Sequence, residues 1–420
     1  MNSLAIQVEQ FGPLENVNFK LAPLMVFTGL SSTGKSYANY LVYYFLSKIC
    51  NGEYKDFFDK GVDFSLQTQV VTFRLDDYLL RLEDEVQDFM RRFLGDDTII
   101  CKAKFISRLR NRECAIEIRK NDIVDDELAT PAAPPKATYT MLVNGHVRNE
   151  RATEYLVETF AVIYVRNYLL GYLLYRSLIY PPGRGSFVGE NFSLKKEVAS
   201  SMDMYNAYFR DYDYGLRNYA ASIKSDLPTK LLEKTSGGDL MTVDGKQFLQ
   251  LDENHRIALS ASASSVKDMS PWLFFLKNHP SEYCAFCLEE PEAHQHPSVT
   301  VQIADVISTL LQRGNIFHVT THSDYLIQRI NQLIKLGYVR SNSPSLFEEI
   351  CRKQNMDLSC FIDASDVSAY YFSKGKNGKT VVKTMNVDEK GIPMTSFFEV
   401  VRDLNERERE IDEIIYRMNK

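Results

Sequence analysis

The sequence lacks the features of a secreted or membrane-spanning protein. Its seven cysteines are an odd number, scattered without the spacing of a disulfide framework, which favours a reducing cytoplasm. Residues 1–10 have neither a basic start nor an apolar core, so we expect no signal peptide. The most apolar stretch, residues 155–175, is interrupted by Glu158 and Arg166. Because charges are costly at the middle of a bilayer, we expect a cytoplasmic protein without a membrane span.

Strong positive charge, internal repeats and long heptad runs are also missing. A net charge of −6 argues against a surface that binds nucleic acid everywhere, although it permits a local basic patch. Without heptads over many turns, the sequence does not support a long SMC-like coiled coil. The chain has 420 residues, of which 45% are hydrophobic, and this is enough for a globular protein with two or more lobes.

Strands alternate with helices near both ends of the chain. The apolar run at residues 24–28 predicts a buried strand, and the almost uniformly apolar residues 35–50 predict a core helix. Apolar runs at residues 283–288 and 316–321 flank a segment with helical spacing at 299–311. This order predicts parallel strands joined by a right-handed crossover. In the middle of the chain, from about residue 54 to residue 235, charged helical stretches dominate and strand runs are few.

One glycine-rich segment fits a phosphate-binding loop. Residues 29–36 match the pattern G-x-x-x-x-G-K-[ST] between a buried strand and a helix, the context that this loop requires. Its glycines let backbone N–H groups surround phosphate oxygens at the positive end of the helix. Lys35 would reach the β- and γ-phosphates of ATP, and the hydroxyl of Ser36 would bind Mg²⁺. The predicted ATP-binding residues are Gly29, Ser31, Ser32, Thr33, Gly34, Lys35 and Ser36.

Two acidic residues end the strand predicted at 283–288. Glu289 would hold Mg²⁺, mostly through water, and Glu290 would polarise the water that attacks the γ-phosphate. The alternative is a zinc site with the ligands Cys284, Cys287, His294 and His296. Strand geometry argues against zinc, because residues three apart point to opposite faces of a strand.

A histidine follows the next predicted strand. His322 comes directly after residues 316–321, and in open α/β sheets ligands lie beyond the carboxyl ends of the strands. Since this strand is one crossover after Glu290, we expect His322 to reach the γ-phosphate or the attacking water. A purely structural histidine is the alternative. The predicted catalytic residues are therefore Lys35, Glu290 and His322.

Together these motifs resemble those of ABC-type ATPases, which include SMC-like proteins and the OLD (overcoming lysogenization defect) family of AAA ATPases. Residues 289–294 (Glu-Glu-Pro-Glu-Ala-His) and 320–323 (Thr-Thr-His-Ser) look like the Walker B and switch-histidine segments of OLD-like ATPases from bacterial anti-phage systems. Tyr180 to Arg184 is similar to a Pro-x-x-Arg strand of that group. OLD nucleases also carry a Toprim nuclease domain, which we do not expect here, because only about fifty residues of this sequence follow Asp366.

The resemblance implies an α/β fold, an ABC-type P-loop ATPase head with a mostly helical insertion. Residues 1–53 and 236–420 would form the two parts of the head, and residues 54–235 the insertion. It further implies a homo-oligomer in which two subunits sandwich ATP. Ser264 would then contact a γ-phosphate in trans, from a signature-like segment. A glycine usually follows the serines of this signature, but Val266 stands here, so we expect slow hydrolysis or use of ATP as a clamp.

The function that the resemblance implies is a sensor or scaffold ATPase of an anti-phage defence system, with ATP and Mg²⁺ as cofactors. A separate effector, a nuclease or a toxin, would carry out the destructive chemistry. Two alternatives remain open. One is an SMC-like ATPase of DNA repair or DNA remodelling, and the other is a scaffold that binds ATP without hydrolysing it.

Two further segments suggest surfaces for partners. Basic side chains crowd residues 102–120 around the alternation of Cys114, Ile116 and Ile118, which predicts a hairpin with a basic outer face. This face is a candidate for contact with nucleic acid, and otherwise it is simply solvated. Residues 396–418 predict a terminal helix whose apolar side packs on its own domain or, alternatively, on a partner.

Overall fold

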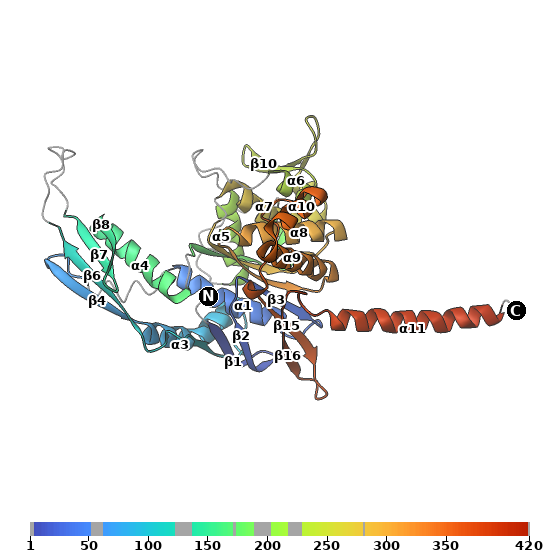
Figure 1. Cartoon of the computed structure of the whole chain (residues 1–420), viewed down its shortest axis with the longest axis horizontal. Coiled ribbons are helices and arrows are strands. Elements are labelled where there is room, and N and C mark those ends of the chain that lie inside the picture. The colour runs from blue at the N-terminus through green and yellow to red at the C-terminus, as the bar shows by residue number, and fades with distance from the viewer. Residues whose placement is uncertain are drawn as a thin grey trace.

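A six-stranded sheet forms the centre of the computed structural model, which describes residues 4–51, 62–121, 137–170, 174–188, 203–216, 229–279 and 282–418 (Figure 1). Its order is β16-β15-β3-β14-β13-β9. These strands are, in that order, Thr380–Met385, Val367–Lys374, Leu24–Gly29, Ile316–Thr321, Cys284–Glu289 and Arg176–Tyr180. The strands from β9 to β15 are parallel, and β16 is antiparallel to β15. This sheet confirms the predicted α/β class.

Different helices cover the two faces of the sheet. Successive side chains of each strand point to opposite faces, so both faces are apolar and both are packed against helices. On one face, α1 (Lys35–Asn51) packs against β9, β13 and β14. On the other face, Trp272 of α7 (Ser264–Asn278) contacts Phe286 of β13 and Phe317 of β14, with ring centroids 6.3 and 6.2 Å apart. Residues adjacent to these two phenylalanines therefore face α1.

An antiparallel sheet of three strands attaches to the outer side of α1. It has the order β2 (Leu14–Lys20), β1 (Ala5–Phe11) and β5 (Cys101–Ile106). Phe105 of β5 stacks on Phe45 of α1 with ring centroids 4.6 Å apart. The helix α3 (Leu75–Leu94) packs on β5. These aromatic and apolar contacts fix the position of α1, and hence of the loop before it.

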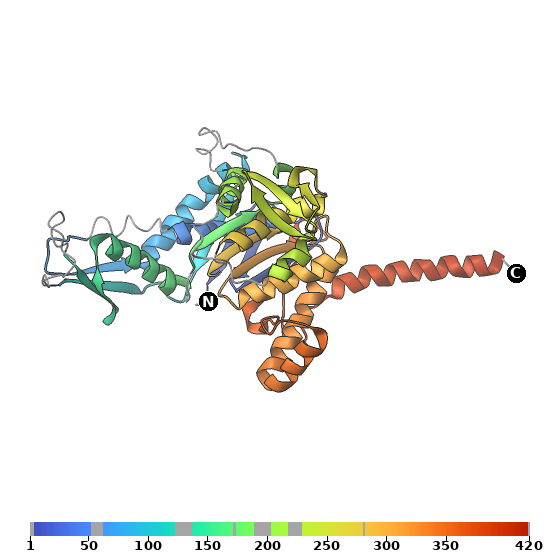
Figure 2. The same ribbon diagram turned by 90° about the horizontal axis from the view of Figure 1, so that it is seen from above.

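The middle of the chain holds more strand than predicted. A four-stranded antiparallel sheet lies away from the central sheet, beside α4 (Glu154–Leu170) (Figures 1 and 2). Its order is β4 (Thr68–Arg74), β6 (Glu113–Lys120), β7 (Tyr139–Val143) and β8 (His146–Ala152). Two further strands of the predicted insertion, β5 and β9, complete sheets of the head. The predicted boundary at residue 53 lies outside the described residues.

The predicted basic hairpin is wrong. β5 pairs with β1, with Ala103 opposite Val8, whereas β6 pairs with β4 and β7. The two halves of the basic segment thus belong to different sheets. The partner of β5 lies far away in the sequence, and β6 pairs with the strands β4 and β7 instead of β5, so the local alternation of apolar residues indicated strands correctly but not their pairing.

The remaining elements complete the head. A small antiparallel sheet of three strands precedes α7, and further helices pack on the central sheet and on one another. These elements are α5 (Met204–Leu216), α6 (Thr229–Ser236), β10 (Asp239–Val243), β11 (Lys246–Gln250), β12 (Arg256–Ala258), α8 (Pro297–Leu311), α9 (Asp324–Asn342) and α10 (Pro344–Gln354).

The terminal helix α11 (Thr395–Met418) projects away from the rest of the molecule (Figures 1 and 2). A helix over the predicted residues is confirmed. The side chains of Leu404, Ile411 and Ile414, however, are exposed. The expectation that they pack on their own domain is therefore wrong, because the helix leaves the body instead of folding back on it.

Candidate nucleotide-binding site

The loop between β3 and α1 has a backbone that requires glycine at two positions. The φ angles of Gly29 and Gly34 are +118° and +94°. A Cβ atom at Gly29 would lie 2.1 Å from the carbonyl oxygen of Phe372 on β15, and one at Gly34 would lie 2.8 Å from Cγ of Pro13. Larger residues would displace either the loop or the strand beside it. The two glycines therefore allow the tight backbone turn in which N–H groups can surround a chain of phosphates.

The side chains of the loop divide into exposed and inward-pointing groups. Ser31 and Ser32 are exposed, and Ser32 has a left-handed φ of +56°. Thr33 is buried, and its hydroxyl donates a hydrogen bond of 2.6 Å to the carbonyl of Leu30. Thr33 thus stabilises the curve, while the two serines remain accessible from outside.

Lys35 points back over the loop. Its ammonium group donates hydrogen bonds to the carbonyls of Gly29 at 3.2 Å and Leu30 at 2.7 Å. Burial lowers the pKa of Lys35, and the carboxylates of Glu290, Glu289 and Glu292 oppose this effect. Three acidic side chains from the other half of the chain are thus close enough to Lys35 to affect its charge. The ammonium group lies where it could meet the terminal phosphates of a nucleotide.

Ser36 and Glu289 meet across the gap between α1 and β13. The hydroxyl of Ser36 donates a hydrogen bond of 2.6 Å to Oε2 of Glu289, which is buried. Burial raises the pKa of Glu289, while hydrogen bonds from Ser36, Asn39 and Thr320 lower it. A hydroxyl and a carboxylate are hard oxygen ligands of the kind that Mg²⁺ prefers. The donor set and the glycine loop therefore fit Mg²⁺ together with a triphosphate.

Glu290 and His322 lie side by side at the carboxyl ends of β13 and β14. Nε2 of His322 is 3.7 Å from Oε1 of Glu290. Glu290 has a left-handed φ of +43°, and its N–H donates to the carbonyl of Thr320 at 3.1 Å. Burial and the charge of Lys35 lower the pKa of His322, whereas Glu290 raises it. All three predicted catalytic residues therefore lie within electrostatic reach of one another.

Glu292 is a site residue that sequence reasoning missed. Its Oε1 atom accepts hydrogen bonds from the hydroxyl of Thr321 at 2.6 Å and from the N–H of His322 at 2.8 Å. Burial raises the pKa of Glu292, and these two hydrogen bonds oppose that shift. The carboxylate thereby holds the segment that carries His322. The sequence offers one signal for it, since Glu292 is the third acidic residue of the segment Glu-Glu-Pro-Glu at 289–292.

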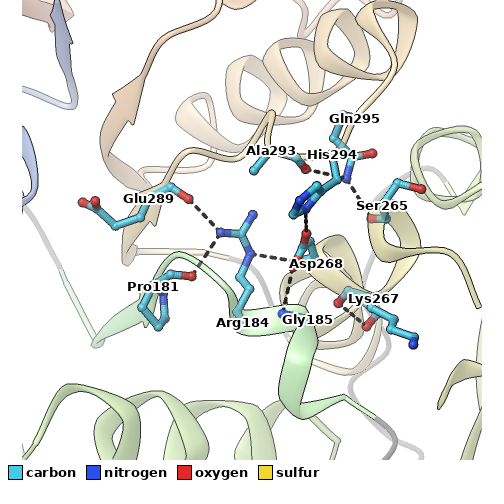
Figure 3. Close-up of polar contacts among 11 residues, drawn as sticks. Pro181, Arg184, Gly185, Ser265, Lys267, Asp268, Glu289, Ala293, His294 and Gln295 are labelled. Atoms are coloured by element: carbon cyan, nitrogen blue, oxygen red, sulfur yellow. Dashed lines mark hydrogen bonds and ion pairs between the residues drawn. The ribbon is translucent and has the colours of Figure 1, made fainter. Parts of the chain in front are cut away.

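Arg184 connects the end of β13 with α7 (Figure 3). Its guanidinium group donates 2.7 Å hydrogen bonds to the main-chain carbonyls of Glu289 and Asp268. The carboxylate of Asp268 accepts from the N–H of Gly185 at 2.8 Å and contacts Nδ1 of His294 at 2.5 Å. Arg184 is 3% exposed, so these contacts satisfy a buried cation. The segment that resembled a Pro-x-x-Arg strand thus ends in a buried junction.

The signature-like segment forms the start of α7. Ser264 is the first residue of this helix and is exposed. Val266 is partly buried and packs against the hydrophobic core. Its side chain is therefore directed toward the protein interior instead of being fully exposed beside Ser264. The role of Ser264 in the site of a second subunit stays a prediction.

Cys284 and Cys287, two of the ligands of the alternative zinc site, both lie in the strand β13. Both are buried, and burial raises the pKa of the Cys284 thiol to about 12. Residues three apart in this strand point to opposite faces of the sheet. In the part of the chain that the structure describes, no group of three or more histidine, cysteine, aspartate or glutamate side chains is placed to hold a metal ion.

Ion pairs neutralise part of the basic segment at residues 102–120. Lys104 pairs with Glu9 at 2.8 Å, and Arg119 pairs with Glu117 at 2.6 Å. Arg110 pairs with both Asp76 and Glu83. Lys102, Arg108 and Arg112 are exposed. Because the segment is divided between two sheets and partly neutralised, it offers less continuous positive charge than the sequence suggested.

The chain matches no family model and no curated protein. It is similar to three solved SMC heads. A head bound to the C-winged helix domain of ScpA has a TM-score of 0.39 and 13% identity, over 92% of this chain and 98% of that chain. A head with an extended coiled coil, bound to the C-terminal domain of ScpA derived from Pyrococcus furiosus, has a TM-score of 0.36 and 12% identity, over 96% and 98%. The head from Thermotoga maritima has a TM-score of 0.33 and 8% identity, over 91% and 98%.

Likeness at such identities concerns the fold alone, so function has to be inferred from the site. Among the described residues, no helix is both long and apolar enough to cross a membrane.

Proposed function

We propose that this chain binds Mg²⁺·ATP in the loop before α1 and hydrolyses it. One observation carries the proposal. Lys35, the pair Glu289–Glu290 and His322 come from three distant segments of the sequence, and their side chains interact at one end of the central sheet. Parallel strands bring their carboxyl ends to this edge, where ligands of α/β proteins bind.

The proposal gives each of these residues a role. Lys35 binds the β- and γ-phosphates, and its present hydrogen bonds to Gly29 and Leu30 keep the ammonium group over the loop. Ser36 and Glu289 are the residues that would hold Mg²⁺. When bound, this ion supplies positive charge to the phosphate oxygens. Glu290 accepts the proton of the attacking water, and His322 contacts the γ-phosphate or that water.

We also propose that two heads sandwich the nucleotide, with Ser264 of one subunit completing the site of the other. The exposed start of α7 supports this proposal, since a helix N-terminus favours contact with phosphate. The buried junction at Arg184 ties this helix to Glu289. A change at one nucleotide site would then reach the surface that faces the partner subunit.

The wider role, a sensor or scaffold ATPase of anti-phage defence that controls a separate effector, rests on the resemblance to OLD-like ATPases. It predicts that a second protein co-purifies with the chain from native cells and is released during infection. The absence of both a partner and a phage phenotype would reject this role, but it would leave the ATPase proposal untouched.

Three variants test the proposed chemistry. Glu290→Gln should retain Mg²⁺·ATP binding, lose at least about 10²-fold in turnover and accumulate as an ATP-bound dimer in light scattering. Lys35→Ala should lose ATP binding. Glu349→Gln, on the exposed surface of α10, is the control and should behave as the wild type. Unchanged turnover in Glu290→Gln would remove Glu290 as the base.

A further inference from the structure

His318 is a fully buried histidine in the middle of the central sheet. It lies on β14, opposite Cys287 on one side and Met25 on the other, and its exposed fraction is 0%. Aliphatic residues usually occupy such positions in a parallel sheet. A buried polar group is costly unless it is hydrogen-bonded. The side chain of His318 therefore requires a partner on the α1 face of the sheet.

Asn39 of α1 is that partner. Nδ1 of His318 lies 2.6 Å from Oδ1 of Asn39, which is also fully buried. The amide nitrogen of Asn39 donates to Oε1 of Glu289, and the hydroxyl of Ser36 donates to Oε2. A continuous chain of hydrogen bonds thus runs from His318 through Asn39 to the carboxylate that we assign to Mg²⁺.

The direction of this chain follows from its chemistry. Oδ1 of Asn39 can only accept, so Nδ1 of His318 must carry the proton. This donor holds the amide oxygen toward β14 and leaves the amide NH₂ group facing Glu289. Without the donor, the amide could turn and place its oxygen against the carboxylate, where two acceptors would repel each other. His318 thus controls an orientation that Asn39 alone does not determine.

We propose that His318 and Asn39 are positioning residues, which hold the carboxylate of Glu289 in the orientation that binds Mg²⁺. This inference rests on the proposed Mg²⁺·ATP site. The position of the pair is that of an outer-shell partner of a metal ligand, and such partners change metal affinity by about 10–100-fold when they are replaced.

The first test is a Mg²⁺ titration of the binding of a fluorescent ATP analogue to the full chain. His318→Leu removes the donor and should raise the Mg²⁺ concentration at half-maximal binding by about 10–100-fold. His318→Asn places an amide N–H near the position of Nδ1 and should restore most of the affinity. His279→Leu is the control, because His279 is equally buried but bonds to the carbonyl of Tyr214. A wild-type Mg²⁺ requirement in folded His318→Leu would overturn the proposal.

The second test needs neither nucleotide nor activity. Because it uses the wild-type chain, it remains decisive even when the His318→Leu variant does not fold. Nitrogen-15 NMR of the histidine side chains in the wild-type chain should show His318 as a neutral ring with its proton on Nδ1. A proton on Nε2 would contradict the proposed direction of the chain. If the wild-type protein binds no ATP analogue at any Mg²⁺ concentration, the proposed function fails, and this result is distinct from both outcomes above.

Discussion

The hydroxyl of Ser36 donates a hydrogen bond of 2.6 Å to the carboxylate of Glu289, although 253 residues separate them in the sequence. Ser36 lies in α1, which follows β3, and β3 is not a neighbour of the strand that ends at Glu289, because β14 lies between β3 and β13. The contact exists because α1 begins beyond the end of β3 and packs across β14 to reach β13. This crossing brings the first and last thirds of the chain to one site. His318 of the intervening strand β14 is linked to that site through its hydrogen bond with Asn39.

Loss of the Glu292 carboxylate should slow hydrolysis without weakening ATP binding. Its Oε1 atom holds both Thr321 and the backbone of His322. In Glu292→Ala the histidine is no longer fixed beside Glu290, and misplacement of a reacting group by about 1 Å can cost about 10²-fold in rate. We expect kcat to fall by about this factor while the Kd for ATP stays within about twofold. Steady-state kinetics and isothermal titration would measure the two quantities.

The matched control for this substitution is Glu349→Ala, which removes an exposed carboxylate from α10. A parallel loss of ATP affinity in Glu292→Ala would show that Glu292 shapes the nucleotide pocket itself instead of positioning His322.

Replacement of Arg184 should destabilise the head. Arg184→Met removes a buried cation and leaves the carbonyl of Glu289 without this donor. Breaking such a buried charged network costs about 3–5 kcal/mol in the free energy of unfolding, which urea denaturation would measure. Arg184→Lys should recover little, because an ammonium group cannot reproduce the planar guanidinium fork.

Arg402→Met provides the comparison for Arg184, since Arg402 is exposed on α11 and its ion pair with Glu406 has the 4.0 Å separation of a weak contact. We expect a change below about 1 kcal/mol there. Equal stability of the Arg184→Met variant and the wild type would refute the structural role of the junction.

The stability of the wild type should depend on pH through His318. Burial lowers the pKa of His318 from 6.5 to about 3, and the hydrogen bond with Asn39 opposes this shift. Between these values the unfolded chain binds a proton that the folded chain does not, so stability falls as the pH falls below 6.5. From pH 7 to pH 5 this residue should contribute a loss of about 2 kcal/mol.

The variant His318→Asn has no titrating group at this position, so its stability should decline less over the same interval. The difference between the two denaturation series isolates the histidine from the carboxylates that titrate nearby. Two parallel curves would mean that His318 binds a proton equally well in the folded and the unfolded chain, so that burial does not lower its pKa.

The sequence was sufficient to locate the residues that meet at the carboxyl ends of β3, β13 and β14. Glycine spacing, an apolar strand with two terminal acids, and a histidine one crossover later are local patterns, and a parallel sheet brings such strand ends together. Asn39 and His318 could not be found in this way, and Arg184 was indicated only by the resemblance to a Pro-x-x-Arg strand, which did not predict its contacts with Glu289 and Asp268. A buried polar side chain has the same local pattern whether it supports a site or packs elsewhere, and only its distant partner distinguishes the two.

The pairing of β5 and β6 failed for the same reason. Cys114, Ile116 and Ile118 alternate with polar residues as a strand should, but alternation does not reveal which strand lies alongside. The strand β5 joins residues 5–11, almost a hundred positions earlier, and its Phe105 also packs against Phe45 of α1. Long-range pairing of this kind is a property of the whole fold.

The most direct measurement is an experimental structure of Glu290→Gln with Mg²⁺ and ATP. We predict the γ-phosphate beside Lys35 and His322, and Mg²⁺ between the phosphates, Ser36 and Glu289. A nucleotide bound elsewhere, or held in the glycine loop with Glu289 and His322 turned away from it, would contradict the claim that these segments serve one Mg²⁺·ATP.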